Sequence, residues 1–386
     1  MIVRRFKRSR VLFSLFALLL ILRISLQRWP TTTHSIVRKM LVFPSSPTAS
    51  NGYCPAAIRN VQGIYARTNS VRTTVDASSS LTAGDRSIHV DDAAASLQNV
   101  VLLVSANYGY RHMLELWTSM ADRHQLQYAI VSMDRQLQSR LLRRNDGDTT
   151  TVLLASQRTA TGASEFRSPE FNTITCNKMR VVLDILEHCK MDVVFSDVDN
   201  IFLQDPFQGE LGRLIRSGQY DYIYQHNDRE GSASCWKGDL EQEGNTGFYY
   251  LSHTASIVQD VMRDTLRTCR QPDNTLDDQT LFWNALRATL RNRQPYRHCN
   301  ATGHNVDYSL FTTDATTTTT ATQDTTTTTA AVTQLCCLNS TLYPIGLGNV
   351  TTETETFHAN YLVGQQKKMA KLREVMQALH LLPQKT

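Results

Sequence analysis

Several common sequence signals are absent from this chain of 386 residues. None of its eight cysteines forms a C-x-x-C pair, which argues against a zinc ribbon. The G-x-G-x-x-G fingerprint of dinucleotide binding is also missing, so a nucleotide would have to be held by other means. No basic face with interleaved aromatic residues occurs, which argues against nucleic acid as a partner. The net charge of +5 comes mostly from the N-terminal residues.

The N-terminus has the pattern of a membrane-targeting segment. Basic residues crowd positions 1–10, and an apolar run follows to Leu22, or to Leu26 if the Arg23 side chain extends to the interface. A cleaved signal peptide and an uncleaved signal anchor both fit, but no small-x-small cleavage site follows, which favours the anchor. We therefore expect a cytosolic tail (1–10) and a transmembrane anchor (11–26), with the remaining chain in a lumen.

Two further features agree with a lumenal location. Glycosylation sequons occur at Asn300, Asn339 and Asn349, in polar surroundings. The cysteine count is even and the expected compartment is oxidising, so disulfides are expected, although their connectivity is not readable. Cys54 has no local partner and would pair either with another chain or with the folded domain.

The remaining chain divides by composition. Residues 27–96 are rich in Ser, Thr and Ala with little periodicity, which predicts a flexible stem. Residues 97–382 contain alternating apolar runs and helical patterns, and we expect one folded domain there. Within it, the threonine-rich stretch 312–333 cannot bury a core and is expected to be a disordered insertion.

The domain is predicted to be α/β. The apolar runs 100–104 and 128–133 are typical of buried strands, and apolar residues recur at helical spacing between them. Such a βαβ unit favours a parallel sheet flanked by helices. A helix over 177–189 would lead into a strand at 193–195, and 220–225 and 244–251 are expected to be further strands.

Two aspartates follow the strand at 193–195. In open α/β sheets, ligands bind at the carboxyl ends of the strands, and alternation along an extended chain would place Asp197 and Asp199 on one face. Two carboxylates at that spacing can hold Mn²⁺ or Mg²⁺, whose other positions take water and substrate phosphates. The alternative is that the pair only caps a turn.

The ordered set of motifs resembles a known family. ANYGY…LW, a strand ending in Asp134, SDVDNIFLQDPF, GNTGFYYL, DDQTLFWNAL and HANYLVGQQKK occur in one sequence. Together they resemble the nucleotide-diphospho-sugar transferases of glycosyltransferase family 77, which are type II Golgi enzymes of GT-A fold. The resemblance implies a Rossmann-like, mixed and mostly parallel sheet flanked by helices, and transfer of xylose, arabinose or galactose with retention of anomeric configuration.

The resemblance also implies roles for named residues. Asp197 and Asp199 would match the D-x-D motif and hold Mn²⁺, with His358 as a third ligand; the alternative for His358 is a surface histidine. Asn245 and Gly247 would line the donor sugar pocket, unless the glycine only marks a bulge in a core strand.

Further roles follow from the same resemblance. Asp278 and Gln279 would lie near the anomeric carbon, as a nucleophile or as a group that stabilises positive charge, unless Asp277 or Asp278 only caps a helix. Gly364 and Lys367 would contact the donor phosphates, as in the H-x-x-G-x-x-K motif of family 8, although five residues instead of two separate His358 from Gly364.

The carboxyl ends of the first two strands are the remaining candidates. Asn107 and Tyr108 follow the first strand and Asp134 the second, where they could hold the nucleotide base. We therefore expect a Golgi-membrane, single-pass type II, metal-dependent glycosyltransferase that uses a nucleotide-sugar donor and a glycan or glycoprotein acceptor. The alternatives are a lumenal metal-dependent phosphohydrolase and a non-catalytic protein of the same fold that binds nucleotide sugars or glycans.

Overall fold

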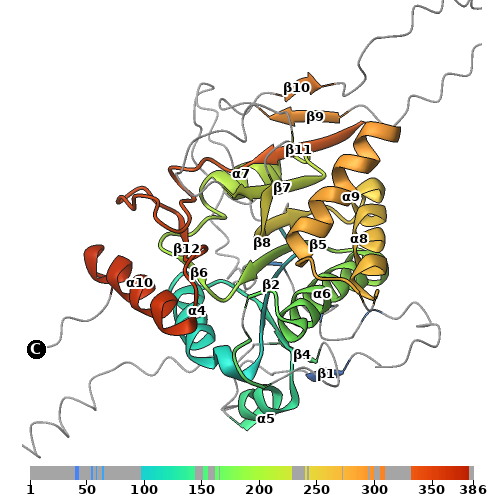
Figure 1. Ribbon diagram of the computed structural model, residues 1–386. Helices are drawn as coiled ribbons and strands as arrows, with labels where there is room; N and C mark the ends of the chain where they lie inside the picture. The colour runs from blue at the N-terminus through green and yellow to red at the C-terminus, as the bar shows by residue number, and fades with distance from the viewer. Residues whose placement is uncertain are drawn as a thin grey trace, which may run out of the picture. The chain divides into compact units, whose positions relative to one another are not determined.

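The computed structural model describes residues 40–42, 54, 58, 63–64, 97–143, 151–154, 161–164, 166–227, 240, 243–271, 273–293, 296–299, 305–308 and 332–381 (Figure 1). The expected tail 1–10, the expected anchor 11–26, Asn300 and most of the threonine-rich stretch 312–333 lie outside these residues. Within the described part, no helix has both the length and the hydropathy needed to cross a bilayer.

A mixed, mostly parallel sheet of ten strands forms the centre of the domain. Its strands are parallel to their neighbours, except that β8 runs antiparallel to β5 and β7, and β10 antiparallel to β9. In spatial order they are β1 (Met40–Val42), β4 (Thr151–Leu154), β3 (Ala129–Ser132), β2 (Val100–Ala106), β5 (Asp192–Asp197), β8 (Gly244–Leu251), β7 (Tyr222–His226), β11 (Thr333–Cys337), β9 (Tyr296–Cys299) and β10 (Asn305–Tyr308).

The order β4-β3-β2-β5 is that of a Rossmann-like half. β2 leads into β3 on one side, and the chain later returns to β5 on the other side. The strand order therefore reverses between β2 and β5, which is where α/β folds bind their ligands. The predicted fold class is confirmed, and the expected strand at 193–195 extends over the whole of β5.

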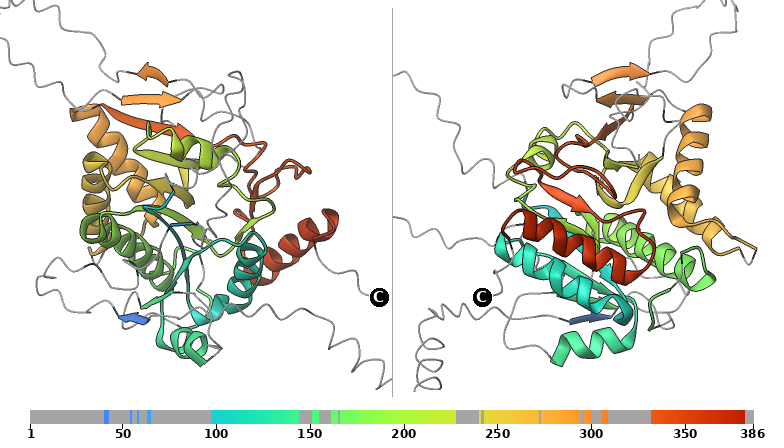
Figure 2. Two further views of the ribbon diagram at one scale, coloured as in Figure 1. Left: turned by 180° about the vertical axis from the view of Figure 1, so that it is seen from behind. Right: turned by 60° about the vertical axis from the view of Figure 1, so that its left-hand side comes forward.

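Helices cover both faces of the sheet (Figure 1). Alternate residues of β2 point into two separate cores: Val100, Leu102 and Val104 into one, Val101 and Leu103 into the other. The first core contains residues of α4 (Arg111–Arg123), α5 (Arg135–Arg143), α7 (Glu210–Arg216) and α10 (Gln365–Ala378), and the second contains residues of α6 (Pro169–Asp184), α8 (Ser256–Cys269) and α9 (Asp278–Arg293). Figure 2 shows α10 lying beside α4.

Helix α6 begins earlier than the periodicity alone predicts. Ser168 caps it by accepting a hydrogen bond from the N–H of Phe171, and Pro169 occupies its first turn, where a missing N–H costs nothing. The helix continues as one π-helical turn, Ile185–Cys189, and ends at Lys190 in a left-handed conformation. Because α6 precedes the parallel strand β5, its N-terminus lies at the carboxyl edge of the sheet.

Disulfides hold distant segments of the domain together. Cys54 bonds to Cys189, Cys176 to Cys269 and Cys299 to Cys336, and none of the described cysteines is free. Of the two alternatives for Cys54, pairing within the domain is therefore the one observed. Described parts of the expected stem also pack on the domain, since β1 pairs with β4 and the side chains of Ile58 and Ile64 are buried. The flexible stem over 27–96 stays a prediction.

A small second sheet brings the C-terminal part of the domain to the end of β5. β12 (Thr356–His358) pairs antiparallel with β6 (Asn200–Phe202), so that His358 lies opposite Asn200. The N–H of Ala359 also donates to the carbonyl of Asp199. Two residues that are 159 positions apart, Asp199 and His358, therefore become neighbours.

Candidate active site

Asp197, Asp199 and His358 converge at the carboxyl end of β5. Asp197 is the last residue of that strand, Asp199 lies in the following turn, and His358 ends β12. One potential ligand atom from each residue lies within 4.8 Å of the other two. Asp199 and His358 are buried, and Asp197 is half-buried. This arrangement of two carboxylates and one imidazole fits the ligands that Mn²⁺ accepts.

Gln225 at the end of β7 orients the imidazole of His358. The amide Nε2 of Gln225 donates to the carbonyl of Tyr343 at 3.0 Å, so its Oε1 faces Nδ1 of His358, also at 3.0 Å. Because this oxygen can only accept, Nδ1 carries the proton, and Nε2 faces Oδ1 of Asp199 at 3.2 Å. That contact is favourable only when a proton or a metal ion lies between the two atoms.

The charge of Asp199 is stabilised by two neighbours. Lys368, on α10, donates to Oδ2 of Asp199, while His358 contacts Oδ1. Burial raises the pKa of Asp199, but Lys368 and then His358 outweigh burial and hold the pKa well below its usual range. Asp199 is therefore a carboxylate at physiological pH and is available as a cation ligand.

A buried lysine links Asp197 to helix α9. Lys178 of α6 is 4% exposed, and its ammonium lies 3.3 Å from both carboxylate oxygens of Asp197 and 3.2 Å from Oδ2 of Asp278. Burial lowers the pKa of Lys178, but the carboxylates of Asp197 and Asp278 more than offset it, so the pKa is raised. Lys178 thus stays charged and fixes the relative positions of the two acids.

Strand β8 has a glycine, Gly247, next to Asp197 and His358. A Cβ atom placed on Gly247 would lie 2.5 Å from Cε1 of His358 and 2.6 Å from Oδ2 of Asp197. Any side chain there would therefore displace Asp197 or His358. Asn245, which is buried, accepts from the N–H of Gly247, and its Nδ2 has no partner among the described residues. A buried amide group of this kind is suited to a ligand hydroxyl.

At the start of α9, two successive aspartates have different contacts. Asp277 caps the helix by accepting from the N–H of Thr280 and pairs with Arg167 at 2.8 Å. Asp278 instead accepts from the hydroxyl of Thr246 at 3.0 Å and pairs with Lys178. The capping role that either residue could have had therefore belongs to Asp277.

Gln279, the next residue, lies beside strand β8. Its Oε1 accepts from the N–H of Thr246 at 3.3 Å, and its Nε2 lies 3.4 Å from a carboxylate oxygen of Glu243. The side chain is half-buried, whereas Asp278 is 3% exposed. Gln279 is therefore the more accessible of the two predicted catalytic residues.

The residues predicted to bind the nucleotide base form hydrogen bonds with neighbouring loop residues. Asn107 donates to the carbonyl of Gly162 and accepts from the N–H of Tyr110. Asp134 accepts from the N–H of Tyr108 and from that of Leu137, which caps α5. These contacts fix the loops after β2 and β3. A donor-binding role for Asn107, Tyr108 and Asp134 stays a prediction.

At the start of α10 the lysine that reaches the site is the neighbour of the predicted one. Gly364 adopts a φ of 92° and precedes the helix. Lys367 is exposed, whereas the ammonium of Lys368 contacts Asp199. The proposed contact of Gly364 and Lys367 with the donor phosphates stays a prediction.

The two described sequons differ in exposure. Asn349 is exposed, and Asn339 is half-buried with its backbone N–H donated to Glu210. The side-chain oxygen of Asn339 accepts from the N–H of Thr341. Both therefore stay predicted glycosylation sites.

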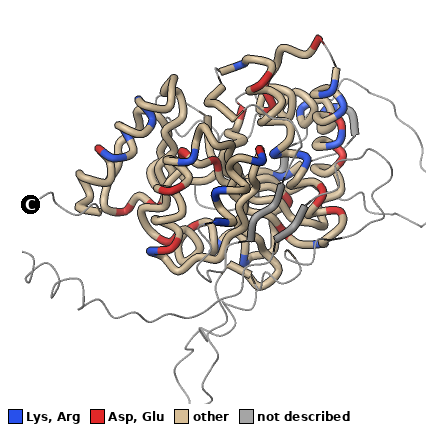
Figure 3. The backbone as a smooth tube through the Cα atoms, turned by 90° about the horizontal axis from the view of Figure 1, so that it is seen from below, with Lys and Arg blue, Asp and Glu red and all other residues tan. Residues whose placement is uncertain are grey.

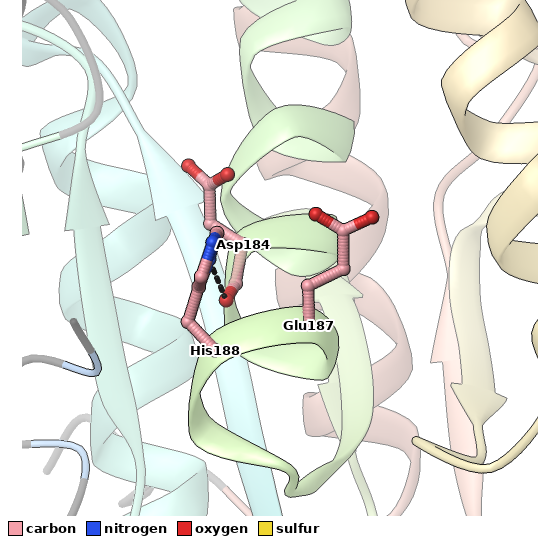
Figure 4. Close-up of side chains that lie close together, drawn as sticks. All are labelled: Asp184, Glu187 and His188. Atoms are coloured by element: carbon pink, nitrogen blue, oxygen red, sulfur yellow. Dashed lines mark hydrogen bonds between the residues drawn. The ribbon is translucent and has the colours of Figure 1, made fainter. Parts of the chain in front are cut away.

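A second cluster with metal-ligand chemistry lies on the π-helical turn and has a different character. Figure 4 shows Asp184, Glu187 and His188 together, with Nδ1 of His188 at the backbone oxygen of Asp184. The cluster is half-buried, and arginines already pair with its acids: Arg263 with Glu187 at 2.6 Å and Arg180 with Asp184 at 3.8 Å. We interpret it as part of a surface ion-pair network. Lys and Arg are intermixed with Asp and Glu along the described backbone (Figure 3).

Three residues of the site were not found by sequence reasoning: Lys178, Gln225 and Lys368. Lys178 occurs in an apolar helix pattern at a position that the structure buries, and a lysine on a core-facing position is a usable signal. Gln225 ends an apolar strand at the ligand-binding edge of the sheet, which is a second usable signal. Lys368 had no such signal, because only the helix rotation distinguishes it from Lys367.

Comparison with known proteins gives a family. The model of a family described as nucleotide-diphospho-sugar transferase matches residues 124–372, which is more than half of the chain. A curated relative, a UDP-D-xylose:L-fucose alpha-1,3-D-xylosyltransferase of Arabidopsis thaliana, is 24% identical over 287 residues, covering 71% of this chain and 68% of that protein.

Solved structures with a similar chain arrangement include two glycosyltransferases. The galactosyltransferase LgtC, in complex with donor and acceptor sugar analogs, has a TM-score of 0.38 and 10% identity, with 73% of this chain and 97% of that chain covered. Mouse xyloside xylosyltransferase 1 has a TM-score of 0.36 and 8% identity, with 68% and 98% covered.

Proposed function

Because this chain belongs to the nucleotide-diphospho-sugar transferase family, and is thus a glycosyltransferase, we propose that it is a metal-dependent, retaining enzyme that uses a UDP-sugar. The observation that carries the proposal is the convergence of Asp197, Asp199 and His358 at the switch point of the sheet. The match to the transferase family argues against a phosphohydrolase and against a non-catalytic protein.

The proposed cofactor is Mn²⁺, with Mg²⁺ as the alternative. Asp197, Asp199 and His358 would hold it, and Gln225 would keep Nε2 of His358 unprotonated and directed at it. A mixed carboxylate and imidazole set suits Mn²⁺ better than Mg²⁺. When bound, such an ion acts as a Lewis acid for the leaving diphosphate.

The two lysines of the site complement this cation. Lys368 forms an ion pair with Asp199, and Lys178 forms one with Asp197. Both ammonium groups therefore flank the place where the donor diphosphate would bind. We propose that Lys368, rather than Lys367, contacts a phosphate. Because the ammonium of Lys368 already contacts Asp199, a small side-chain movement would let it pair with a donor phosphate instead.

For the donor sugar we propose contacts from β8 and the start of α9. The unpartnered Nδ2 of Asn245 would donate to a sugar hydroxyl, and Gly247 would admit the ring. Oδ2 of Asp278 contacts both Lys178 and the hydroxyl of Thr246, and the residue is 3% exposed, so Asp278 is better placed to position its neighbours than to attack the donor sugar. We therefore favour front-face attack, with Gln279 placed to stabilise positive charge at the anomeric carbon, over a covalent intermediate on Asp278.

Donor and acceptor identity form the finer part of the proposal. Xylose, arabinose and galactose are the candidate donor sugars, and the xylosyltransferase relative favours UDP-xylose. The acceptor would be a sugar residue of a glycan or glycoprotein. Three disulfides and two described sequons support a lumenal catalytic domain, held in the Golgi membrane by the segment 11–26.

A transfer assay tests the proposal. The full-length protein, purified in detergent, is incubated with UDP-xylose, UDP-arabinose or UDP-galactose, Mn²⁺ and methyl glycosides of L-fucose and D-galactose, and the anomeric configuration of the product is read by NMR. We expect one donor to give a retained product that is lost with EDTA and in Asp197→Asn combined with Asp199→Asn. Transfer that survives both changes would contradict the metal assignment, and an inverted product would contradict retention.

A further inference from the structure

A set of exposed apolar side chains lies next to the metal-ligand histidine. The described residues expose five large apolar side chains, and three of these lie in two adjoining turns: Leu347 at 60%, Tyr361 at 41% and Val363 at 71%. The turns touch, because a Cβ atom on Gly346 would lie 3.1 Å from the carbonyl oxygen of Asn360 and 3.2 Å from the ring of Tyr361. We call these three residues the Tyr361 cluster.

Tyr361 is held in a conformation that costs free energy. Its φ is 61°, a left-handed value that is rare for a bulky residue other than glycine. The surroundings enforce it: the N–H of Tyr361 donates to Oδ1 of Asn360 at 2.9 Å, and its hydroxyl donates to the carbonyl of Asn227 at 2.6 Å. Folding alone would be served better by glycine, and strain of this kind gathers at ligand-binding segments.

The cluster is at the same edge of the sheet as the metal ligands. Asn227 directly follows β7, and β7 runs in the direction of β5 because both are antiparallel to β8. Gln225 anchors His358 and Asn227 anchors Tyr361, so one strand end positions both residues. Three residues after His358, the Cα of Tyr361 is at most about 11 Å from that of His358.

The order of strands assigns an order to the parts of a substrate. A nucleotide sugar is linear: base, diphosphate, sugar, and then the acceptor that attacks the sugar. Across the sheet the sites run from β3 and β2, where the base is predicted, to the ligands at β5, the glycine and asparagine of β8, and then the end of β7. The end of β7, with Tyr361, is therefore in the acceptor's place.

We propose that the ring of Tyr361, flanked by Leu347 and Val363, is the platform on which the apolar face of an acceptor sugar packs; this rests on the proposed function. The hydroxyl of Tyr361 is bonded to Asn227 and its ring lies close to Gly346, so the exposed part of this ring is what a ligand can contact. A pyranose has a face of C–H groups that fits a fixed aromatic ring, while its rim hydroxyls stay free for hydrogen bonds. An exposed apolar patch beside a catalytic centre is typical of such a binding surface.

The test separates acceptor binding from donor binding. In full-length protein with UDP-xylose, Mn²⁺ and methyl α-L-fucoside or methyl β-D-galactoside, we compare wild type, Tyr361→Gly and Tyr361→Phe. Glycine keeps the left-handed backbone but removes the ring, and phenylalanine keeps the ring but removes the hydroxyl. We expect Tyr361→Gly to raise the acceptor KM at least tenfold and Tyr361→Phe to raise it less than threefold. The donor KM and the Mn²⁺-dependent thermal shift with UDP-xylose should be unchanged in both.

Gln125→Gly is the matched control. Gln125 is an exposed residue with a φ of 56° in the turn after α4, at the opposite edge of the sheet, and its replacement should leave the acceptor KM unchanged. An acceptor KM in Tyr361→Gly within twofold of the wild-type value would overturn the platform. An equal rise of the acceptor KM in Tyr361→Phe would also overturn it. If the wild-type protein shows neither a donor-dependent thermal shift nor transfer, the proposed function fails together with the platform. If the thermal shift is present but the acceptor KM of Tyr361→Gly equals that of wild type, only the platform is refuted.

Discussion

Six titratable side chains meet at the end of β5, and their charges nearly cancel. Three are carboxylates, two are lysines, and His358 is the sixth. A divalent cation added to the three carboxylates and two ammonium groups would leave one positive charge to receive the anionic diphosphate of a donor. This charge balance supports the proposal that the site binds a divalent cation together with an anionic diphosphate.

Removing the ammonium of Lys178 should destabilise the protein strongly. Lys178→Met leaves Asp278, whose side chain is 5% exposed, without its cation, and we expect a loss of about 3 kcal/mol in the free energy of unfolding. Urea unfolding in EDTA measures this. The double variant Lys178→Met with Asp278→Asn should lose less than the single one, because only the half-buried Asp197 is then left without its cation. Equal losses would show that the lysine acts by packing alone.

Gln225 should determine metal affinity without touching the metal. Gln225→Met removes the acceptor for Nδ1–H of His358 and frees the ring to turn, so we expect Mn²⁺ affinity to fall 10–100-fold, by about the loss typical of such supporting contacts. Mn²⁺ titration by calorimetry is the measurement. Gln259→Met is the control: Gln259 is similarly buried and donates to the carbonyl of His253, so stability should fall and Mn²⁺ affinity should not. A similar affinity in both variants would refute the role.

At the scale of elements, four strand ends and one helix start create the site. β5 leads into the two aspartates, β12 ends at His358, β7 carries the glutamine that orients His358, β8 places Gly247 beside them, and α9 begins with the acid that faces Lys178. The antiparallel insertion of β8 between β5 and β7 matters because it places Gly247 against the ligands. A parallel strand at that place would present its carboxyl end to the site instead of its first residues.

Strand β8 should therefore not tolerate a side chain at Gly247. In Gly247→Ala the added methyl group would overlap His358 and Asp197, so we expect transfer activity to fall at least 100-fold, with donor-dependent stabilisation by Mn²⁺ lost. Gly162→Ala is the control, because a Cβ atom there meets nothing within 4 Å. Activity measurements on both variants decide the point, and a fully active Gly247→Ala enzyme would mean that the ligand set lies elsewhere.

At the scale of the whole molecule, disulfides connect segments that the sheet alone does not hold. The bond from Cys54 to Cys189 closes a loop with a sequence separation of 135 and attaches the region before the domain to the end of the π-helical turn. The bond from Cys176 to Cys269 joins α6 to α8 two residues before Lys178. Both bonds support α6, which carries the lysine of the site.

Replacing Cys54 and Cys189 together by serine should lower the free energy of unfolding by on the order of 4 kcal/mol, because the unfolded chain gains the freedom of a long loop. Denaturant unfolding measures the loss. The donor KM at low temperature should be unchanged, since neither residue contacts the site. A lowered donor affinity in the folded double variant would instead place this bond within the binding machinery.

Sequence patterns predicted what is local and missed what only tertiary structure brings together. The apolar and aromatic run Gly244–Leu251 predicted β8 to its ends, and the abrupt end of an apolar run predicted the edge position of Asp197. Lys178 and Gln225 escaped because their partners lie 19 and 133 residues away. The contact of Lys368 with Asp199 was not predicted, because motif spacing does not show which side of a helix faces the site. His358 was named as a candidate ligand only through family resemblance, and its role as a ligand stays a prediction.

The central claim is that Asp197, Asp199 and His358 hold a metal ion required for donor binding. The most direct test is calorimetric titration of UDP-xylose into full-length protein with Mn²⁺, with EDTA, and into Asp199→Asn with Mn²⁺, each shown to be folded by its thermal transition. We predict binding with Mn²⁺ and at least 100-fold weaker binding in the other two titrations. Equal affinity with Mn²⁺ and with EDTA would contradict the account.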